Sequence, residues 1–201
     1  LLNPKNLPLE PVHDPAQPDK PLVCSVEIGM HQVYFQAWRV NVGRVPVYLL
    51  DTNRPENEQH FRDLTLRVYG GDSTTRIMQE ILLGIGGVRL LRALKVQPSV
   101  FHMNEGHAAF QLLERCAFRM RQGLDVYAAM ELVAAGTVFT THTPVPAGHD
   151  IFERHLVEKY LGPAVRDLGL DFEQVYRLGL NSGGGFNMTC LALRCTRFHN
   201  G

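Results

Sequence analysis

Several features that would point to particular protein classes are missing from this chain of 201 residues. Its four cysteines show no CxxC spacing, so neither a zinc ribbon nor a thioredoxin-type site is indicated. No apolar run approaches the roughly 18 residues that a membrane-spanning helix needs. Few cysteines and no recognisable signal peptide favour a cytoplasmic location with reduced thiols. The first residue is Leu1 rather than methionine, so we expect the N-terminus to be a cut end.

An excess of charge of one sign is also missing. The 20 lysines and arginines balance the 20 aspartates and glutamates, which gives a formal net charge of zero. No basic stripe suggests nucleic acid, and no polybasic cluster suggests an anionic membrane. A neutral sugar or a small anion suits this balance better. Hydrophobic residues make up 45% of the chain, which is enough for a folded core.

Prolines gather at the start of the chain, where residues 1–21 hold six of the twelve. Proline donates no hydrogen bond to a sheet and breaks helices, so we expect an extended surface segment. The next part is rich in β-branched and aromatic residues and predicts three strands, Leu22–Ile28, His31–Asn41 and Val45–Leu50. Glycines between these runs favour antiparallel hairpins within residues 22–50.

The middle predicted strand changes the parity of its apolar positions. Its first half carries Val33, Phe35 and Ala37, and its second half carries Trp38, Val40 and Val42. Side chains alternate between the two faces of a strand, so this change predicts a bulge near residues 37–38 or burial on both faces. The polar stretch after the third strand, residues 51–63, is expected to be a loop.

The period then changes to that of a helix. Ile77, Ile81, Ile85 and Val88 form one apolar stripe. Three glycines at positions 84, 86 and 87 lie inside this pattern, and each should cost a helix interior about 1 kcal/mol relative to alanine. Close packing of the helix backbone against a neighbour would compensate for this cost.

Strands and helices alternate after that point. The pattern predicts strands at Ser99–Met103 and Thr137–Thr141, with a helix at Ala108–Gln122 between them. Asp125 and Asp171 are placed to cap further helices. Alternation of this kind is typical of a parallel α/β layer.

Polar side chains follow both predicted strands of this layer. One strand runs into Asn104-Glu105-Gly106-His107, and the other runs into Thr141-His142-Thr143-Pro144. Ligands of open α/β sheets bind beyond the carboxyl ends of the strands. Carboxylate, imidazole and hydroxyl groups can each bind the hydroxyls of a sugar. These two strand ends are therefore candidate sugar-binding segments, and the alternative is that their histidines are ordinary structural residues.

Other motifs have weaker interpretations. His102 and His107 lie five positions apart and do not share a helix face, so a zinc motif is disfavoured. Glycine runs at residues 84–87 and 183–185 lack the context of a phosphate loop. The segment Tyr69–Asp72 precedes a helix, and it could meet a ligand or be a simple turn in which Asp72 or Ser73 caps the helix.

Five segments resemble, in sequence and in order, the shorter bacterial and archaeal type of α-glucan phosphorylase (glycogen, starch or maltodextrin phosphorylase). They are Val42–Asn53, Tyr69–Leu94, His102–Phe110, Val138–Phe152 and Phe186–Arg194. The resemblance implies that residues 22–201 are an incomplete, Rossmann-like N-terminal domain of a two-domain glycosyltransferase of the GT-B type. It also implies an internal piece of the parent enzyme, without the C-terminal cofactor domain.

The resemblance further implies a retaining transferase that releases α-glucose 1-phosphate from α-1,4-glucan ends with inorganic phosphate. His142 then matches the catalytic-site histidine of the glucose subsite. The implied substrate-binding residues are Asp72, Ser73, Glu105, His107 and Thr143. No metal ligand is implied.

The family's cofactor, pyridoxal phosphate, binds to a lysine and basic residues that match no part of this chain. The resemblance therefore implies an inactive isolated piece. Its implied partners are an α-1,4-glucan or maltooligosaccharide and phosphate, with no nucleic acid and no membrane, and the complete enzyme could be an oligomer. The alternative hypothesis is a non-catalytic carbohydrate-binding or structural remnant of the same fold.

Overall fold

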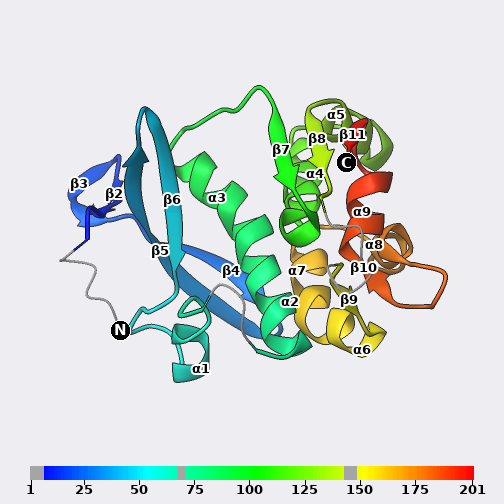
Figure 1. The fold of residues 1–201 in the computed structure, drawn as a ribbon, viewed down its shortest axis with the longest axis horizontal. Coiled ribbons are helices and arrows are strands. Elements are labelled where there is room, and N and C mark those ends of the chain that lie inside the picture. Colours follow the sequence, from blue (N-terminus) through cyan, green and yellow to red (C-terminus); the bar gives the residue numbers. More distant parts are fainter. Residues whose placement is uncertain (1–6, 68–70, 143–148) are drawn as a thin grey trace.

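The computed structural model describes residues 7–67, 71–142 and 149–201. These residues form a mixed α/β structure in which a long helix lies between an antiparallel sheet and a small parallel sheet (Figure 1). Among the described residues, no helix combines the length and the apolar character required to cross a bilayer.

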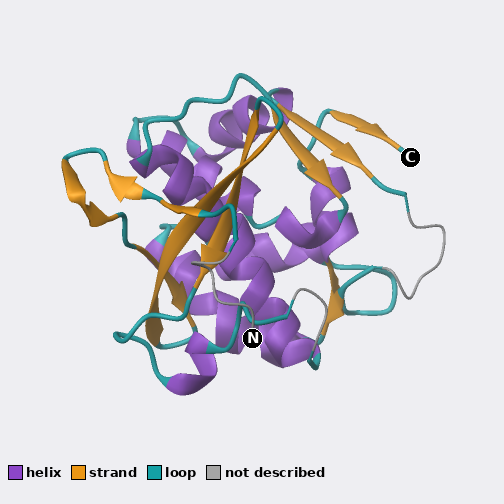
Figure 2. Cartoon of the chain, turned by 60° about the vertical axis from the view of Figure 1, so that its left-hand side comes forward, coloured by secondary structure: helices purple, strands orange, loops and turns teal. Residues whose placement is uncertain are grey.

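The antiparallel part confirms the three predicted strands and adds short ones before them. Its strands are β1 (Glu10–Pro11), β2 (His13–Asp14), β3 (Gln17–Pro21), β4 (Cys24–Ile28), β5 (His31–Val42) and β6 (Val45–Asp51). The first half of β5 pairs with β4 and the second half with β6, so both predicted hairpins form. The long β5–β6 hairpin crosses the helices in Figure 2. The proline-rich start is therefore not merely extended, because β1 pairs with β5 and β2 with β3.

The predicted bulge in the middle strand is wrong. The pairing of β5 with β4 and then with β6 runs on without a shift in register. Val33, Phe35 and Ala37 are buried, whereas Val42 is 63% exposed. The parity changes because the strand leaves the core after Ala37, and the polar environment of Trp38 reflects this, since its indole N–H donates to Asp51 at 2.9 Å.

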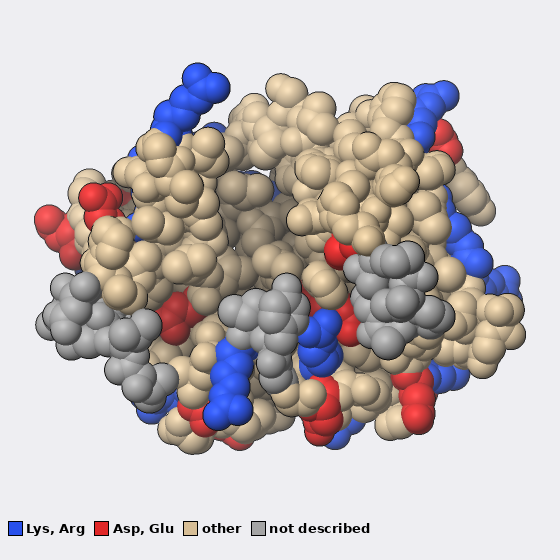
Figure 3. Space-filling model, viewed as in Figure 1, with Lys and Arg blue, Asp and Glu red and all other residues tan. Residues whose placement is uncertain are grey.

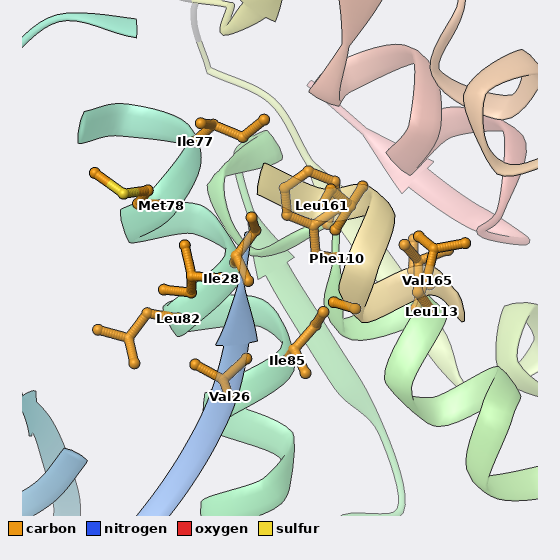
Figure 4. Close-up of a cluster of buried hydrophobic side chains, with 14 of the residues drawn as sticks. Val26, Ile28, Ile77, Met78, Leu82, Ile85, Phe110, Leu113, Leu161 and Val165 are labelled. Atoms are coloured by element: carbon orange, nitrogen blue, oxygen red, sulfur yellow. The ribbon is translucent and has the colours of Figure 1, made fainter. Parts of the chain in front are cut away.

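The long helix confirms the predicted apolar stripe. It consists of α2 (Ser73–Ile81), a π-helical segment η2 (Leu82–Gly86) and α3 (Gly87–Ala93). Ile77, Ile81 and Ile85 have no exposed surface, and Val88 is 8% exposed. Figure 4 shows Ile77 and Ile85 of this stripe in one buried cluster with Ile28 of β4 and Phe110. The helix is therefore the centre of the hydrophobic core.

Glycine allows the close packing that the sequence predicted at the middle of this helix. A Cβ atom at Gly84 would lie 2.8 Å from the main-chain nitrogen of Gln111 and 2.9 Å from the Cβ of Phe110. At Gly87 the same construction meets nothing within 4 Å. Close packing therefore explains Gly84 but not Gly87.

The remaining elements are the short helix α1, before the long helix, and the helices and strands that follow it. They are α1 (Gln59–Arg62), β7 (Phe101–Asn104), η3 (Gly106–Ala108), α4 (Gln111–Arg121), α5 (Val126–Ala135), β8 (Thr137–Thr140), β9 (Ile151–Phe152), α6 (Arg154–Leu156), η5 (Val157–Leu161), α7 (Gly162–Asp167), α8 (Phe172–Gly179), β10 (Phe186–Asn187), α9 (Met188–Arg194) and β11 (Phe198–Asn200). The helix α1 interrupts the loop expected at residues 51–63. The predicted caps are confirmed, because the Asp125 carboxylate accepts from two main-chain N–H groups of α5 and that of Asp171 accepts from one of α8.

The predicted parallel layer is also confirmed. Strands β7, β8 and β11 form a parallel sheet in the order β11-β8-β7. The sequence did not predict β11, whose residues contain only one strongly β-favouring side chain, Phe198. All three carboxyl ends lie at the same edge, which is the edge where a ligand would bind.

Ion pairs connect the long helix to the neighbouring elements α4 and β4. Glu114 of α4 is 1% exposed and accepts hydrogen bonds from Arg89 at 3.1 Å, Arg92 at 2.8 Å and Arg121 at 3.4 Å. Arg89 also bonds Glu27 of β4 at 2.7 Å. On the face shown in Figure 3, the described basic and acidic side chains are interspersed rather than gathered by sign.

That face is hollowed beside the β5–β6 hairpin (Figure 3). A cavity of about 290 Å³ is lined by residues of β1 and β2, by Arg39 and Tyr48 of the hairpin, and by Leu94 after α3. Among the described residues, no predicted site residue lines this cavity, and the predicted strand ends lie instead at the edge of the parallel sheet.

Candidate functional site

The two predicted strand ends meet through Glu105 and His142. The main-chain N–H of Glu105 donates to the carbonyl of Thr140 at 2.8 Å, which extends the pairing of β7 and β8. The Glu105 carboxylate then accepts the main-chain N–H of His142 through one oxygen and the hydroxyl of Thr141, at 3.1 Å, through the other. Glu105 therefore holds the chain in place where it leaves β8, and the His142 residue beyond it is exposed.

The backbone at Glu105 is strained. Its dihedral angles are φ 65° and ψ 176°, a region that is occupied almost only by glycine. Such a conformation costs about 1–3 kcal/mol and persists where the surroundings enforce it. The next residue explains part of this constraint, because a Cβ atom at Gly106 would lie 2.9 Å from the Cβ of Met188 in α9. Because the turn at Gly106 packs closely against α9, the side chain of Glu105 is held next to the end of β8.

His107 lies in a second cluster, built from the turn η3, the helix α2 and the residue before β9. Its Nδ1 lies 2.9 Å from the Asp150 Oδ2 and 3.4 Å from the Glu80 Oε1. Arg76 lies one turn before Glu80 and donates to both oxygens of Asp150, at 2.9 and 2.7 Å. The main chain of Asp150 is fixed as well, since its carbonyl accepts the N–H of Met188 at 3.0 Å.

The electrostatics of this cluster favour a protonated imidazole. The hydrogen bond with Asp150, supported by the one with Glu80, raises the pKa of His107 to about 9. Burial raises the pKa of Glu80 to about 8, so this carboxyl is neutral at pH 7. Burial alone would raise the pKa of Asp150, but hydrogen bonds to His107, Glu80 and Arg76 outweigh it and hold that pKa well below its usual value.

The structure places the other predicted site residues less decisively. Asp72 is exposed, and its carboxylate accepts the main-chain N–H of Thr75 at 2.9 Å, which makes it the N-cap of α2. Ser73 is the first residue of that helix and is exposed. Thr143 and residues 69–70 of the segment considered in the sequence lie outside the described residues. Asp72 and Ser73 thus lie at the same end of α2 as Arg76.

A metal ion is not indicated by these contacts. Ligand atoms of Glu80, His107 and Asp150 lie within 4.8 Å of one another, which a cation could in principle bridge. The guanidinium of Arg76, however, already neutralises Asp150 and binds both of its oxygens. The zinc motif considered from the sequence does not form either, since His102 bonds the Thr140 hydroxyl instead, at 2.8 Å.

Sequence reasoning identified Glu105, His107 and His142 but missed Arg76, Glu80 and Asp150. The opposite charges of Arg76 and Glu80 at a spacing of four residues were visible, but such a pair is typical of any solvated helix face. Asp150 gave no signal, because it is 74 residues away from its arginine partner. Only the packing of α2 against η3, with Asp150 placed beside both, brings these groups together.

Comparison with known proteins supports the motif resemblance. The chain is 45% identical over 198 residues, 98% of its length, to the maltodextrin phosphorylase of Thermococcus litoralis, of which this covers 23%. It is 43% identical over 214 aligned positions to the glycogen phosphorylase of Mycobacterium tuberculosis, covering all of this chain and 25% of that protein. The glycogen phosphorylase of Aquifex aeolicus is 37% identical over 183 residues, or 89% of this chain and 26% of that protein.

No model of a known protein family matches the chain. The chain spans about a quarter of the length of the curated relatives that it matches. These identities confirm the resemblance to maltodextrin and glycogen phosphorylases. Along nearly its whole length, this chain is related to one segment of the maltodextrin and glycogen phosphorylases.

Proposed function

We propose that the chain is part of an α-glucan phosphorylase and supplies residues of its glucose subsite. The reaction releases α-glucose 1-phosphate from α-1,4-glucan ends, with inorganic phosphate as the second substrate. The observation that carries the proposal is the meeting of two strand ends, at which Glu105 fixes the main chain of His142. The Rossmann-like character of the domain is part of the same proposal, supported by the parallel order β11-β8-β7.

The side chains of His142 and His107 can both form hydrogen bonds with the hydroxyl groups of a sugar. The exposed His142 can donate to or accept from a hydroxyl near the reacting carbon. His107, held by Asp150, can offer a second contact from the turn that follows β7. Because both residues lie at the carboxyl edge of one parallel sheet, one glucose unit placed over that edge can meet both of them.

The described part of the chain offers no fitting site for pyridoxal phosphate. Its lysines, Lys20, Lys95 and Lys159, are all exposed, and none neighbours the strand ends through a hydrogen bond or ion pair. A lysine that holds this cofactor needs a low-dielectric setting that lowers its pKa. We therefore derive no step of the reaction through the cofactor from these residues, and we expect the isolated chain to lack phosphorylase activity.

The test compares the 201-residue chain with the complete polypeptide of which it forms part. Glucose 1-phosphate formed from maltoheptaose and phosphate is measured with and without pyridoxal phosphate. We expect cofactor-dependent product from the complete polypeptide and none from the 201-residue chain. No product from a folded, cofactor-loaded polypeptide would contradict the proposal and favour a non-catalytic carbohydrate-binding protein.

The role of His142 is tested in the same assay. His142→Ala should lower kcat/KM by about a hundredfold or more, as expected for a polar contact at the reacting sugar. The matched control is His155→Ala, because His155 is exposed on α6 and its imidazole lies beside Glu153. Equal activity of both variants and the parent would remove His142 from the site.

A further inference from the structure

We propose that Asp150 and Glu80 are positioning residues for His107: they turn its Nδ1 into the protein and leave Nε2 as the atom that meets the sugar. The inference rests on the proposed function, because it assumes that His107 contacts the substrate. It adds three residues, Arg76, Glu80 and Asp150, that neither the motifs nor the resemblance assigned to the site.

The hydrogen bonds fix the tautomer of the ring. An ionised carboxylate only accepts hydrogen bonds, so the Nδ1 that faces Asp150 at 2.9 Å must carry a proton. Among the described residues, none bonds Nε2, and the His107 side chain is 31% exposed. The ring therefore has one nitrogen committed to the protein and one available to a ligand. This is the arrangement in which a carboxylate orients a functional histidine.

Asp150 is itself held from two directions. One guanidinium nitrogen of Arg76, Nη2, lies within hydrogen-bond distance of both carboxylate oxygens, which holds the carboxylate toward α2. The main-chain carbonyl of Asp150 accepts the N–H of Met188 at the start of α9. Both contacts are only partly solvated, since the side chains of Arg76 and Asp150 are 22% and 18% exposed. Contacts from α2 and α9 therefore fix Asp150, and Asp150 in turn fixes the position of His107.

Glu80 is the buried neighbour of His107 in this cluster. Its side chain is 4% exposed, and among the described residues its Oε2 finds no hydrogen-bond partner. Its other oxygen, Oε1, lies 3.4 Å from Nδ1 of His107 and favours the same ring orientation as Asp150.

The arrangement also sets the chemical character of Nε2. The groups that face His107 are Glu80 and Arg76 from α2 and Asp150 from the segment before β9. The two carboxyl groups raise the pKa of His107 to about 9, so at neutral pH Nε2 carries a hydrogen and donates. It can bind the oxygen of a sugar hydroxyl. If Asp150 were neutral, the pKa of His107 would fall, and Nε2 would lose its hydrogen at a lower pH.

The first test measures the ring directly. The imidazole nitrogens of the 201-residue chain are titrated by NMR, with His107 assigned through His107→Gln. We expect His107 to titrate well above the ordinary 6.5 with its proton on Nδ1 in the neutral form, and Asp150→Asn to lower its pKa by at least one unit. Asp167→Asn is the control, because Asp167 is an exposed acid that contacts Arg89 instead. A His107 pKa near 6.5, or one that Asp150→Asn leaves unchanged, would overturn the inference.

The second test uses the complete polypeptide and keeps the inference falsifiable should the shorter chain fail to fold. Asp150→Asn should lower kcat/KM at pH 7 by about tenfold, a loss of about 1.4 kcal/mol. It should also move the alkaline limb of the pH profile to lower pH. Asp150→Glu should restore part of the activity, and Asp167→Asn should change neither quantity.

The two tests separate the inference from the proposed function. A raised pKa that depends on Asp150, in a complete polypeptide without phosphorylase activity, would contradict the proposed function and leave the orientation of His107 in place. An active polypeptide whose pH profile is the same with Asp150→Asn would refute the positioning role alone. Loss of activity with an unchanged profile would equally refute it, because that is the signature of a merely structural residue.

Discussion

The carboxylate of Glu105 accepts the main-chain N–H of His142, a residue 37 positions further along the chain. This contact joins the ends of two neighbouring parallel strands and determines where the exposed histidine leaves the sheet. The role of Glu105 in this contact is to hold the main chain of His142 in place. The resemblance to α-glucan phosphorylases implied a substrate-binding role for the same residue, and both roles can be separated experimentally.

Replacement of Glu105 by glutamine should therefore lower activity without unfolding the protein. An amide oxygen accepts more weakly than a carboxylate, and a hydrogen bond to a charged group contributes about 1.5–3 kcal/mol. We expect kcat/KM of the complete polypeptide to fall by about ten- to a hundredfold, with a circular dichroism spectrum like that of the parent. Unchanged kinetics would show that His142 needs no such support.

The strain at Glu105 predicts an unusual order of stability between two variants. Glycine tolerates φ 65° and ψ 176° whereas alanine does not, so Glu105→Gly should be more stable than Glu105→Ala by about 1–3 kcal/mol. Both variants lose the same carboxylate, which cancels in the comparison. Urea unfolding of the chain measures the difference. Alanine being the more stable of the two, as it is at ordinary positions, would disprove the strain.

Two glycines of the long helix should respond oppositely to alanine. At Gly84 the added methyl group would meet Gln111 and Phe110 at less than 3 Å, which should cost about 1–3 kcal/mol. At Gly87 it meets nothing within 4 Å, and alanine should stabilise the helix by about 0.5–1 kcal/mol. The midpoints of urea unfolding decide this, and equal shifts at both positions would contradict it.

The buried Glu80 predicts a dependence of stability on pH. Its pKa is raised from 4.5 to about 8, so its neutral form is favoured in the fold. This contribution is fully present below pH 4.5 and is lost as the pH rises through 8, by at most about 1.4 kcal/mol per pH unit. His107, with its pKa raised to about 9, adds a loss between pH 6.5 and 9.

The variant Glu80→Gln isolates the first of these effects. Glutamine stays neutral, so the stability of the variant relative to the parent should increase steadily from pH 5 to pH 8 in urea unfolding. Glu131→Gln on the exposed surface of α5 is the control and should show no such trend. A constant difference between parent and Glu80→Gln would mean that Glu80 is not neutral in the fold.

The buried Glu114 should be among the most sensitive positions. It is 1% exposed, and its removal would leave the guanidinium groups of Arg89 and Arg92 without their shared carboxylate. Loss of one partner from such a buried cluster costs about 3–5 kcal/mol. Arg121→Ala is the matched change, because this arginine is 49% exposed and should contribute less than about 1 kcal/mol. Comparable losses from Glu114→Ala and Arg121→Ala would be inconsistent with a buried cluster.

Periodicity was enough to predict most of the elements. The stripe from Ile77 to Val88 predicts a buried helix because side chains three and four positions apart share one face. The same reasoning failed at Ala37, where the parity of apolar residues changes although the pairing is regular. Sequence parity reports which side chains are apolar, but it does not report where the strand leaves the core.

The sequence by itself determined the relationship to the phosphorylases, the parallel α/β layer and the strand ends that carry Glu105, His107 and His142. Those properties follow from local patterns and motifs, which are readable along one chain. Only the tertiary structure decided that Glu105 fixes the main chain of His142, and that Asp150 joins Arg76 to His107. The physical reason is that hydrogen bonds and ion pairs depend on distances of about 3 Å between atoms. Packing of helices against strands brings those atoms together across many positions, and no spacing along the sequence encodes that.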